Sequence, residues 1–303
     1  CLATDHAPHT PADKAAGISR EVIAVSRFSN AQTARELEEA GVRVISLDLL
    51  EYDRLHFLPD AENILYMAGR KFGTAEDAPA TWAMNAVVPS FVSRRFAGAN
   101  IVVFSSGNVY PLVHLARGLD GCTEEVPPQP VGEYAMSCLA RERIFQYAAE
   151  NYGTKALIFR LNYAVDMRYG VLYDIGEKVY AGKPVSLAMP YFNCIWQGDA
   201  NEMAIRALLH TGSPAKILNV TGPETVSVRV AAEKFGQVFG RAPVFADEPG
   251  DTALLSDANK ALKLFGYPEY TVDDLIEMQA TWILNGGRGL GKPTHFEVRD
   301  GVY

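Results

Sequence analysis

The chain has 303 residues, of which 48% are hydrophobic and 21% charged, and its formal net charge is −8. This composition is ordinary for a globular protein with a sizeable core and excludes a disordered chain. Lys and Arg form no basic run, which argues against a nucleic-acid or anionic-membrane surface. No apolar stretch approaches the roughly 20 residues that span a bilayer. We therefore expect a cytoplasmic protein with no nucleic-acid or membrane partner.

Cysteine and histidine are sparse and scattered along the chain. The four cysteines, Cys1, Cys122, Cys138 and Cys194, include no C-x-x-C pair, so we expect reduced thiols rather than disulfides or a zinc knuckle. His6 and His9 are too isolated to form a metal site, and we expect no bound metal.

Short, continuously apolar segments rich in β-branched residues alternate with segments of helical period. The pattern predicts strands over 21–27, 43–49, 63–69, 100–106, 155–162 and 215–222, with helices over 31–41, 81–98, 134–153 and 198–212. Strands that alternate with helices form right-handed βαβ units and an α/β fold with a doubly wound parallel sheet. Ligands of such sheets bind outside the carboxyl ends of the strands, where polar motifs lie in this sequence.

The regular alternation ends after residue 162. Helices are predicted over 225–240, 257–266 and 271–287, and the tail 291–303 is expected to be an irregular wrap. We therefore expect a smaller C-terminal substrate lobe. The predicted boundaries assign 1–162 and 195–222 to a Rossmann-like dinucleotide-binding domain, and 163–194 and 223–303 to the substrate lobe.

Sequence motifs lie at the ends of the predicted strands and at the start of one helix. In chain order they read "SRF", "LDLLEYDRL", "MAGR", "FSSGNVYP" and "EYAMSC". This series resembles the extended short-chain dehydrogenase/reductase family, particularly its NAD-dependent epimerase/dehydratase branch, over residues 21–285. The resemblance implies a Rossmann-like sheet, a bound NAD or NADP, and a small sugar-like substrate.

The resemblance assigns cofactor contacts to residues that follow the second, third and fourth strands of the family's sheet. Asp48 would accept a hydrogen bond from the adenine amino group and Leu49 would pack on the ring; the alternative for Asp48 is a helix N-cap. Ser26 and Arg27 stand where an acidic residue would select NAD. A hydroxyl and a guanidinium suit a 2′-phosphate, which favours NADP, unless Arg27 only caps a loop.

Further cofactor contacts follow from the same resemblance. The turn Ala68–Gly69–Arg70 would allow the backbone to approach the cofactor closely. Asn85 matches a helix asparagine that supports the active-site backbone, and Asn162 would read the nicotinamide amide.

The candidate catalytic pair is Ser106 and Tyr134. By the resemblance, Ser106 would hydrogen-bond a carbonyl or alcohol oxygen of the substrate, and Tyr134 would exchange a proton with that oxygen. Sugar dehydratases of the family carry an acidic pair where this chain has Gly107 and Asn108. We therefore do not expect water elimination.

The position four residues after Tyr134, where the family has a lysine, holds Cys138. A neutral thiol cannot lower the pKa of the tyrosine by its charge. Cys138 is interpreted as a small buried residue, with a reactive thiol as the alternative. Arg141 and Arg143 are candidates for the missing charge, and Arg141 lies on the tyrosine's helix face.

The family's glycine-rich phosphate loop is also absent. Residues 1–20 contain a single glycine, Gly17. Either "CLAT" forms a shortened first strand and Thr10 caps "PADKAAG", or this stretch is a truncation, a fusion scar or a misassigned sequence. Fewer backbone N–H groups could then approach a pyrophosphate, which predicts weak cofactor affinity.

The substrate side is assigned by position. Asn108, Tyr163 and Gln197 are candidate sugar contacts, Arg168 is a candidate clamp for an anionic group, and Trp196 suits either a sugar contact or the core. The leading hypothesis is an NAD(P)-dependent oxidoreductase or epimerase that acts on a sugar hydroxyl or ketone. Such proteins often form homodimers through the helix with the tyrosine and the helix before it. The alternative is a catalytically impaired relative with a binding or regulatory role.

Overall fold

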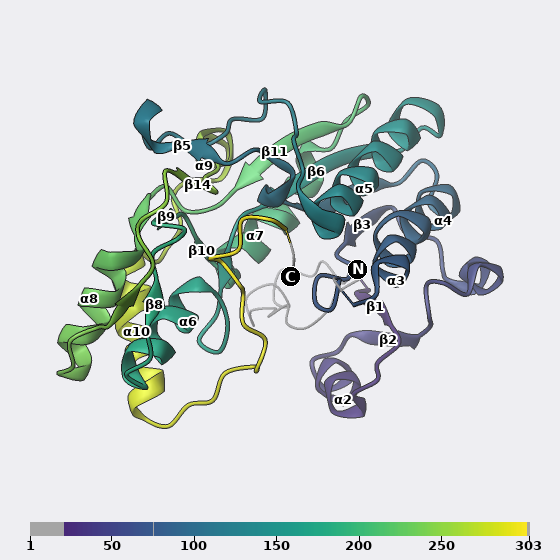
Figure 1. Cartoon of the computed structure of the whole chain (residues 1–303). Coiled ribbons are helices and arrows are strands. Elements are labelled where there is room, and N and C mark those ends of the chain that lie inside the picture. Colours follow the sequence, from purple (N-terminus) through teal and green to yellow (C-terminus); the bar gives the residue numbers. More distant parts are fainter. Residues whose placement is uncertain (1–20, 75, 302–303) are drawn as a thin grey trace.

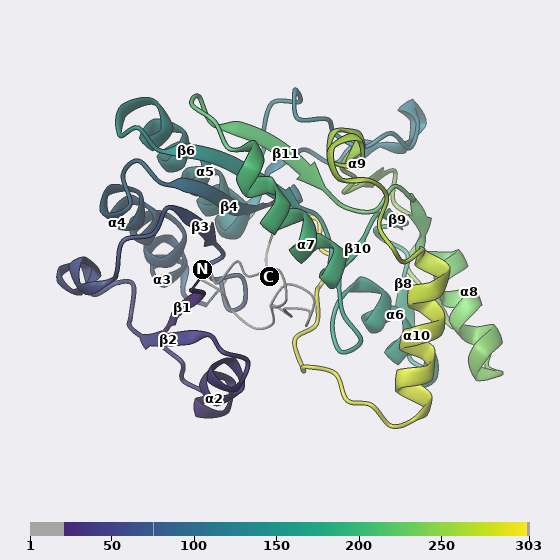
Figure 2. The ribbon, with the colours of Figure 1, turned by 180° about the vertical axis from the view of Figure 1, so that it is seen from behind.

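A computed structural model describes residues 21–74 and 76–301. Its centre is a four-stranded parallel sheet with the strand order β11-β6-β4-β3 (Figures 1 and 2). The central residues of β4 and β6 are buried on both faces of the sheet, which explains why these strands are continuously apolar. The strands are β3 (Asn63–Tyr66), β4 (Asn100–Ser106), β6 (Lys155–Leu161) and β11 (Lys216–Val220).

A second, two-stranded parallel sheet precedes the central one. It pairs β1 (Ile23–Ser26) with β2 (Arg43–Ser46), and helix α2 (Ala31–Glu39) connects the two strands. Asn30 caps α2 by accepting a hydrogen bond from the backbone N–H of Gln32. Val25 of β1 shares one hydrophobic cluster with residues of β3 and β4, so the two sheets belong to a common core.

Helices cover both faces of the central sheet, which confirms the predicted doubly wound α/β class. On one face, Val88, Val92 and Phe145 pack against the strands. On the other face, Met203 and Phe265 do so. The first group of helices is α3 (Ala78–Trp82), the π-helical turn Ala83–Val87, α4 (Val88–Arg95) and α5 (Gly132–Asn151), and the second is α7 (Gln197–Ala207) and α9 (Asn259–Phe265).

A smaller C-terminal lobe is built around α6 (Val171–Tyr180), α8 (Val228–Phe239) and α10 (Val272–Leu284). Short strand pairs join these helices, and the lobe lies beside the carboxyl ends of the sheet strands (Figure 1). Helix α9 differs from the sequence prediction that placed 223–303 wholly in this lobe. Ala261 and Phe265 of α9 pack with sheet residues, because their apolar side chains share one helix face. The short strands are β5 (Val113–His114), β7 (Ala164–Val165), β8 (Val185–Ser186), β9 (Tyr191–Phe192), β10 (Ile195–Trp196), β12 (Val226–Ser227), β13 (Phe245–Ala246) and β14 (Thr252–Ala253).

The segment 285–301 after α10 is irregular, as predicted, and it returns across the molecule (Figure 1). Phe296 is buried in the core of the C-terminal lobe. Thr294 donates two hydrogen bonds to Asp174 Oδ2, from its N–H at 2.7 Å and from its hydroxyl at 2.5 Å. Gly301 lies directly against Val131 and Gly132 at the start of α5. The tail therefore connects the small lobe to the helix that carries Tyr134.

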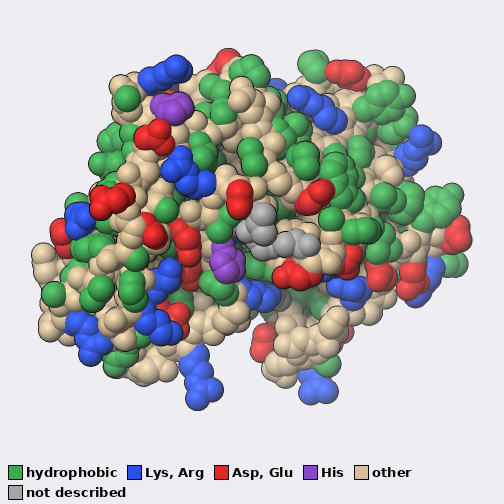
Figure 3. All heavy atoms as spheres, in the orientation of Figure 1, with side chains coloured by type: hydrophobic (Ala, Val, Ile, Leu, Met, Phe, Trp, Pro, Cys, Tyr) green, Lys and Arg blue, Asp and Glu red, His purple; other side chains and the backbone are tan. Residues whose placement is uncertain are grey.

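Acidic and basic side chains are interspersed over the face of the molecule seen in Figure 3. Across residues 21–74 and 76–301, no helix combines the length and the apolar character needed to cross a membrane.

Candidate active site

Ser106 and Tyr134 meet at the carboxyl end of β4. The Ser106 hydroxyl accepts from the backbone N–H of Asn108 at 3.1 Å and donates to Asn108 Oδ1 at 2.8 Å. Tyr134 lies in the first turn of α5, and its hydroxyl is a hydrogen-bond partner of Ser106. The structure thus brings together the two residues that the sequence pairs across 28 positions.

Cys138 lies one helical turn after Tyr134 and has no exposed surface. It packs in a small apolar cluster with Val109, Tyr110 and Cys122. Burial raises the pKa of the Cys138 thiol, and the nearby Arg141 guanidinium only partly opposes this shift. The thiol is therefore neutral at pH 7, which fits the small buried residue expected at this position.

Asn85 is the centre of a buried hydrogen-bond network next to this pair. Its Oδ1 accepts from the backbone N–H of Arg70 at 2.8 Å, and its Nδ2 donates to the carbonyl of Arg70 at 2.9 Å and to Ser137 Oγ at 2.9 Å. The side chain thus supports the backbone after β3, as the sequence predicts. Asn85 lies in the π-helical turn, a distortion that often occurs at functional sites.

The electrostatic surroundings of Tyr134 keep its hydroxyl protonated. Burial is the main cause that raises the pKa of Tyr134 well above its usual value, and Cys138 adds to the shift. Arg141 and the hydrogen bond with Ser106 lower it. Tyr134 therefore needs nearby positive charge to act as a base.

Lys71 is a residue of this site that the sequence reasoning missed. Burial lowers the pKa of Lys71, while the charges of Asp174 and Cys138 raise it. The ammonium lies 5.7 Å from the centroid of the Phe72 ring, in the loop after β3. Lys71 directly follows the "MAGR" motif, and this position in the sequence could have indicated that it belongs to the site.

The predicted adenosine-side residues lie at the ends of β1 and β2. Ser26 is the last residue of β1, and Arg27 is exposed with no ion-pair partner among the described residues. Asp48 Oδ1 accepts from the backbone N–H of Leu50 at 3.0 Å and so caps a turn. Leu49 is packed in the core cluster of the sheet, so its predicted contact with an adenine ring has no support from its burial.

The turn after β3, which was predicted to let the backbone approach the cofactor, makes contacts with other parts of the protein. Arg70 pairs with Asp77 at 3.2 Å, and Ala68 packs against the core. The space at Gly69 faces Arg141, because a Cβ built on Gly69 would lie 2.5 Å from Arg141 Nη2.

The predictions for "CLAT", Thr10, His6 and His9 lie outside the described residues.

The predicted substrate residues are only partly brought together. Asn108 and Tyr163 line a cavity of about 40 Å³ with Tyr110, and the tail residues Val298 and Arg299 form its other side. The described lining of this cavity does not include Arg168 or Gln197.

The remaining substrate-side predictions lie around the cavity. Asn162 donates to Asn193 Oδ1 at 2.7 Å. Arg168 pairs with Asp166 at 3.4 Å. Gln197 begins α7, and the Trp196 ring packs 6.0 Å from the ring of Tyr270, which favours the core role for Trp196.

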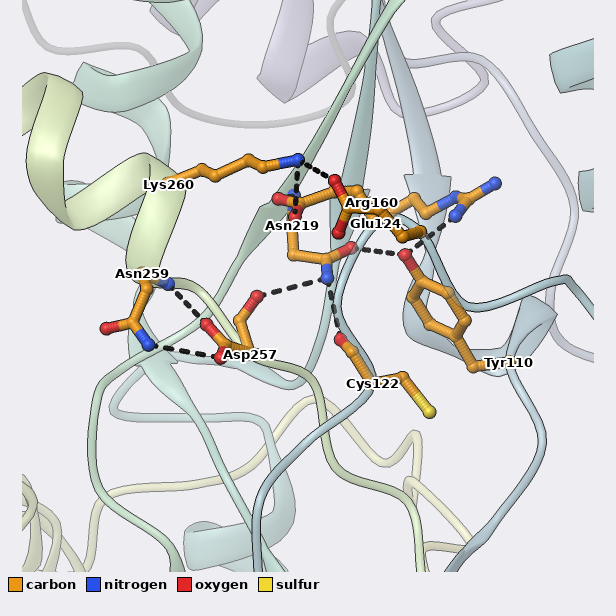
Figure 4. A network of polar contacts seen from close by, with 9 residues as sticks. Tyr110, Cys122, Glu124, Arg160, Asn219, Asp257, Asn259 and Lys260 are labelled. Atoms are coloured by element: carbon orange, nitrogen blue, oxygen red, sulfur yellow. Dashed lines mark hydrogen bonds and ion pairs between the residues drawn. The ribbon is translucent and has the colours of Figure 1, made fainter.

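A second buried polar network, which the sequence reasoning also missed, lies at the carboxyl ends of β4 and β6, and Figure 4 shows its part from Arg160 through Tyr110 to Asn219. Arg160 of β6 makes two hydrogen bonds to Glu142 of α5, at 2.9 and 2.6 Å. Arg160 also donates to the Tyr110 hydroxyl at 2.7 Å, which donates to Asn219 Oδ1 at 2.8 Å. Ser105, the residue before Ser106, donates to Glu142 Oε1 at 2.6 Å. The network therefore fixes the strands that end in the candidate site.

The family model described as the NAD dependent epimerase/dehydratase family matches residues 11–165. The chain belongs to this family. The search of curated protein sequences found no match. The family assignment confirms the resemblance seen in the sequence motifs.

Solved structures of epimerases share the fold of this epimerase/dehydratase family member. UDP-glucuronic acid 4-epimerase from Bacillus cereus in complex with NAD aligns with a TM-score of 0.74 and 15% identity, over 89% of this chain and 92% of the other. UDP-glucose 4-epimerase from Thermus thermophilus in complex with NAD gives 0.70 and 20%, over 89% and 93%. UDP-glucose 4-epimerase from Thermotoga maritima with UDP-glucose gives 0.72 and 15%, over 91% and 94%.

Proposed function

We propose that this family member is an NAD(P)-dependent oxidoreductase or epimerase that acts on a hydroxyl or ketone of a sugar, and that the sugar is attached to a nucleoside diphosphate. The observation that carries the proposal is the hydrogen-bonded pair of Ser106 and Tyr134 at the carboxyl end of β4. Several structural neighbours carry bound UDP-sugars, among them the Thermotoga maritima epimerase with UDP-glucose, and this supports the choice of substrate class.

The reaction requires a proton transfer that these two side chains can perform. Ser106 would hold the reacting sugar oxygen by a hydrogen bond, and Tyr134 would take the proton of that oxygen when the alcohol becomes a ketone. In the reverse direction, Tyr134 would return the proton. The nicotinamide cofactor, when bound, accepts and donates the hydride.

The described residues fit the adenosine half of a dinucleotide. Ser26 and Asp48 lie at the carboxyl ends of the paired strands β1 and β2, and Gly69 follows the carboxyl end of β3 in the central sheet. Arg27 is exposed, and its guanidinium would hold a 2′-phosphate, which favours NADP over NAD. Asn162 would face the nicotinamide amide. Asn85 would support the cofactor-side backbone that it already binds.

The tail residues beside Asn108 and Tyr163 support a site that is closed on its substrate side. A nucleotide sugar requires more than about 40 Å³, since ligand pockets are typically about 300–1,000 Å³. Substrate entry would therefore displace Val298 and Arg299. A homodimer through α4 and α5 is part of the proposal, and light scattering would test it.

The competing proposal is a catalytically impaired relative with a binding or regulatory role, which the neutral thiol at Cys138 favours. Titration with NADH and NADPH, followed by energy transfer from tryptophan, separates the two. We expect binding, and turnover with UDP-glucose or UDP-glucuronic acid that disappears in Tyr134→Phe although the variant still binds cofactor. No cofactor binding at millimolar concentration would leave only the regulatory role.

A further inference from the structure

The helix that carries Tyr134 has a neutral thiol where a cation would assist proton transfer. A positive charge close to a tyrosine hydroxyl favours the phenolate. Three cationic residues lie near enough in the sequence or the fold to be considered: Arg141, Arg143 and Lys71. Arg143 is exposed and donates to Gln146 Oε1 at 2.8 Å, so its charge is directed at solvent.

Arg141 occupies the interior side of the same helix. It follows Tyr134 by seven residues, or two helical turns, which places both on one face. The residue is only 5% exposed. Its Nη1 donates to the carbonyl of Phe104 at 2.8 Å, and its Nη2 donates to Asn85 Oδ1 at 2.7 Å. The guanidinium is therefore held between the end of β4 and the Asn85 network.

Gly69 provides the space that this arrangement requires. A Cβ on Gly69 would lie 2.5 Å from Arg141 Nη2 and 3.1 Å from Asn85 Oδ1. Any side chain at position 69 would therefore displace the guanidinium or the amide. Three segments that are distant in sequence, at residues 69, 85 and 104, thus accommodate one buried cation.

The described contacts of the Arg141 guanidinium are hydrogen bonds to neutral groups and the ring of Tyr66, whose centroid lies 5.9 Å away. No described carboxylate forms an ion pair with this guanidinium, and the adjacent Glu142 is instead bound to Arg160. Arg141 Nε also has no hydrogen-bond partner in the described part of the chain. Burial of an uncompensated charge is costly, and its field acts strongly because the surroundings have a low dielectric constant.

We propose that Arg141 is the fixed cation that acts on the Tyr134 hydroxyl in place of the lysine absent from position 138. The inference deepens the proposed function, on which its importance for turnover rests. Arg141 acts through Tyr134 and is a positioning residue, not a group that touches the substrate. Because a guanidinium does not lose its proton in proteins, this charge is constant at every accessible pH.

Other groups also act on the tyrosine, and the test must separate them. Tyr134 faces Cys138 and Arg141 from its own helix and Ser106 from β4. Lys71, from the loop after β3, influences Cys138. Burial lowers the pKa of Lys71, so Lys71 loses its positive charge more readily than Arg141 does.

The test uses a fluorinated tyrosine incorporated at position 134 of the full chain. Fluorine lowers the pKa of the phenol, so that its titration can be followed by ¹⁹F NMR within the pH range in which the protein is folded. The proteins compared are the parent, Arg141→Gln, Arg141→Lys, and Lys71→Gln as the matched control. Arg141→Gln removes the charge and keeps an amide donor for Asn85.

We expect the titration midpoint to move to higher pH in Arg141→Gln and to stay near the parent value in Arg141→Lys. We expect a smaller movement in Lys71→Gln. If Arg141→Gln does not fold, Gly69→Ala tests the position of the charge in its place, because its Cβ displaces the guanidinium; a midpoint that stays at the parent value in Gly69→Ala would then overturn the proposal. An unchanged midpoint in the charge-removing variants, or a larger movement in Lys71→Gln, would overturn the proposal.

Activity provides a separate readout with unmodified Tyr134. We expect kcat/KM at pH 8 to fall by about tenfold or more in Arg141→Gln, since one pKa unit corresponds to a tenfold change in phenolate, and to recover in Arg141→Lys. If the parent protein neither binds NADH nor turns over a sugar, the proposed function fails. The movement of the NMR midpoint would still establish Arg141 as the cation that acts on Tyr134.

Discussion

The ion pair between Arg160 and Glu142 supports a quantitative prediction about the framework of the site. Both side chains are fully buried, with 1% and 0% of their surfaces exposed, and the closest N–O distance is 2.6 Å. Arg160 also donates a hydrogen bond to the Tyr110 hydroxyl, which in turn donates to Asn219 Oδ1 (Figure 4). Glu142 neutralises the charge of Arg160 and, with Ser105 as a third partner, fixes the end of β4.

Replacing Glu142 by Gln leaves the Arg160 guanidinium buried without a counter-charge. Loss of one partner of a buried pair costs about 3–5 kcal/mol, and we expect this decrease in the free energy of unfolding for Glu142→Gln. Arg160→Met should cost a similar amount, because a buried carboxylate then remains. The double variant has no uncompensated charge, so its loss should be smaller than the sum of the two by about 2 kcal/mol or more.

Urea unfolding followed by circular dichroism at pH 7 measures the four proteins of this double-mutant cycle. Arg54→Met, which removes an exposed ion pair with Glu51, is the control and should cost at most about 1 kcal/mol. If the two buried substitutions add within about 0.5 kcal/mol, they are energetically independent, and the reasoning about compensation is refuted.

Four further expectations follow from the structure. Tyr134→Phe should abolish turnover while Cys138→Ala leaves it nearly unchanged, because the buried thiol is neutral; steady-state kinetics with the reverse result would assign the chemistry to the thiol. Arg27→Ala should reduce the affinity for NADPH more than for NADH, and equal affinities in both proteins by calorimetry would remove the argument for a 2′-phosphate contact. Burial raises the pKa values of Cys138 and Cys194, so above about pH 8.5 these thiols ionise in the unfolded chain and stay protonated in the folded one. The unfolded chain then binds fewer protons, and the free energy of unfolding should fall by up to about 1.4 kcal/mol per pH unit for each thiol, with a smaller slope in Cys194→Ala; a slope unchanged in that variant would contradict the assignment. Gly132→Ala should release the tail, because its Cβ would collide with the carbonyl of Gly301, whereas Gly153→Ala has a similar positive φ and no atom within 4 Å. Limited proteolysis should cut the tail faster only in Gly132→Ala, and equal rates in both variants would show that the Gly301 contact does not hold it.

The sheet could be predicted from local sequence patterns, and the meeting of Ser106 with Tyr134 from the family resemblance. The apolar strands are read directly from the sequence, since burial on both faces requires continuous hydrophobic segments. Once β4 is followed by α5, Ser106 at a strand end and Tyr134 at a helix start must lie on the same edge of the sheet. Asn85 was predicted by resemblance, and its hydrogen bonds to the backbone of Arg70 give that position a physical reason.

The remaining features depend on contacts that no local pattern records. Helix α9 has the same apolar spacing whether it packs on the small lobe or on the sheet, so the sequence could not distinguish the two. Arg160 and Glu142 are 18 positions apart and lie on different elements. The tail contributes Val298 and Arg299 to the cavity through contacts that form only after α10 has packed. Each of these outcomes is decided by tertiary packing rather than by propensity.

The position of the cation determines which functions it can perform. A lysine ammonium is a flexible point charge with three donors, which suits it both to act on a tyrosine and to bind a cofactor hydroxyl. The Arg141 guanidinium is held by Asn85 and the carbonyl of Phe104, so it can supply charge to Tyr134 but has little freedom to reach a ribose. Under the proposed function, the two tasks of one lysine are therefore divided in this chain. The charge resides on Arg141, and the cofactor must be held by other groups along the strand ends.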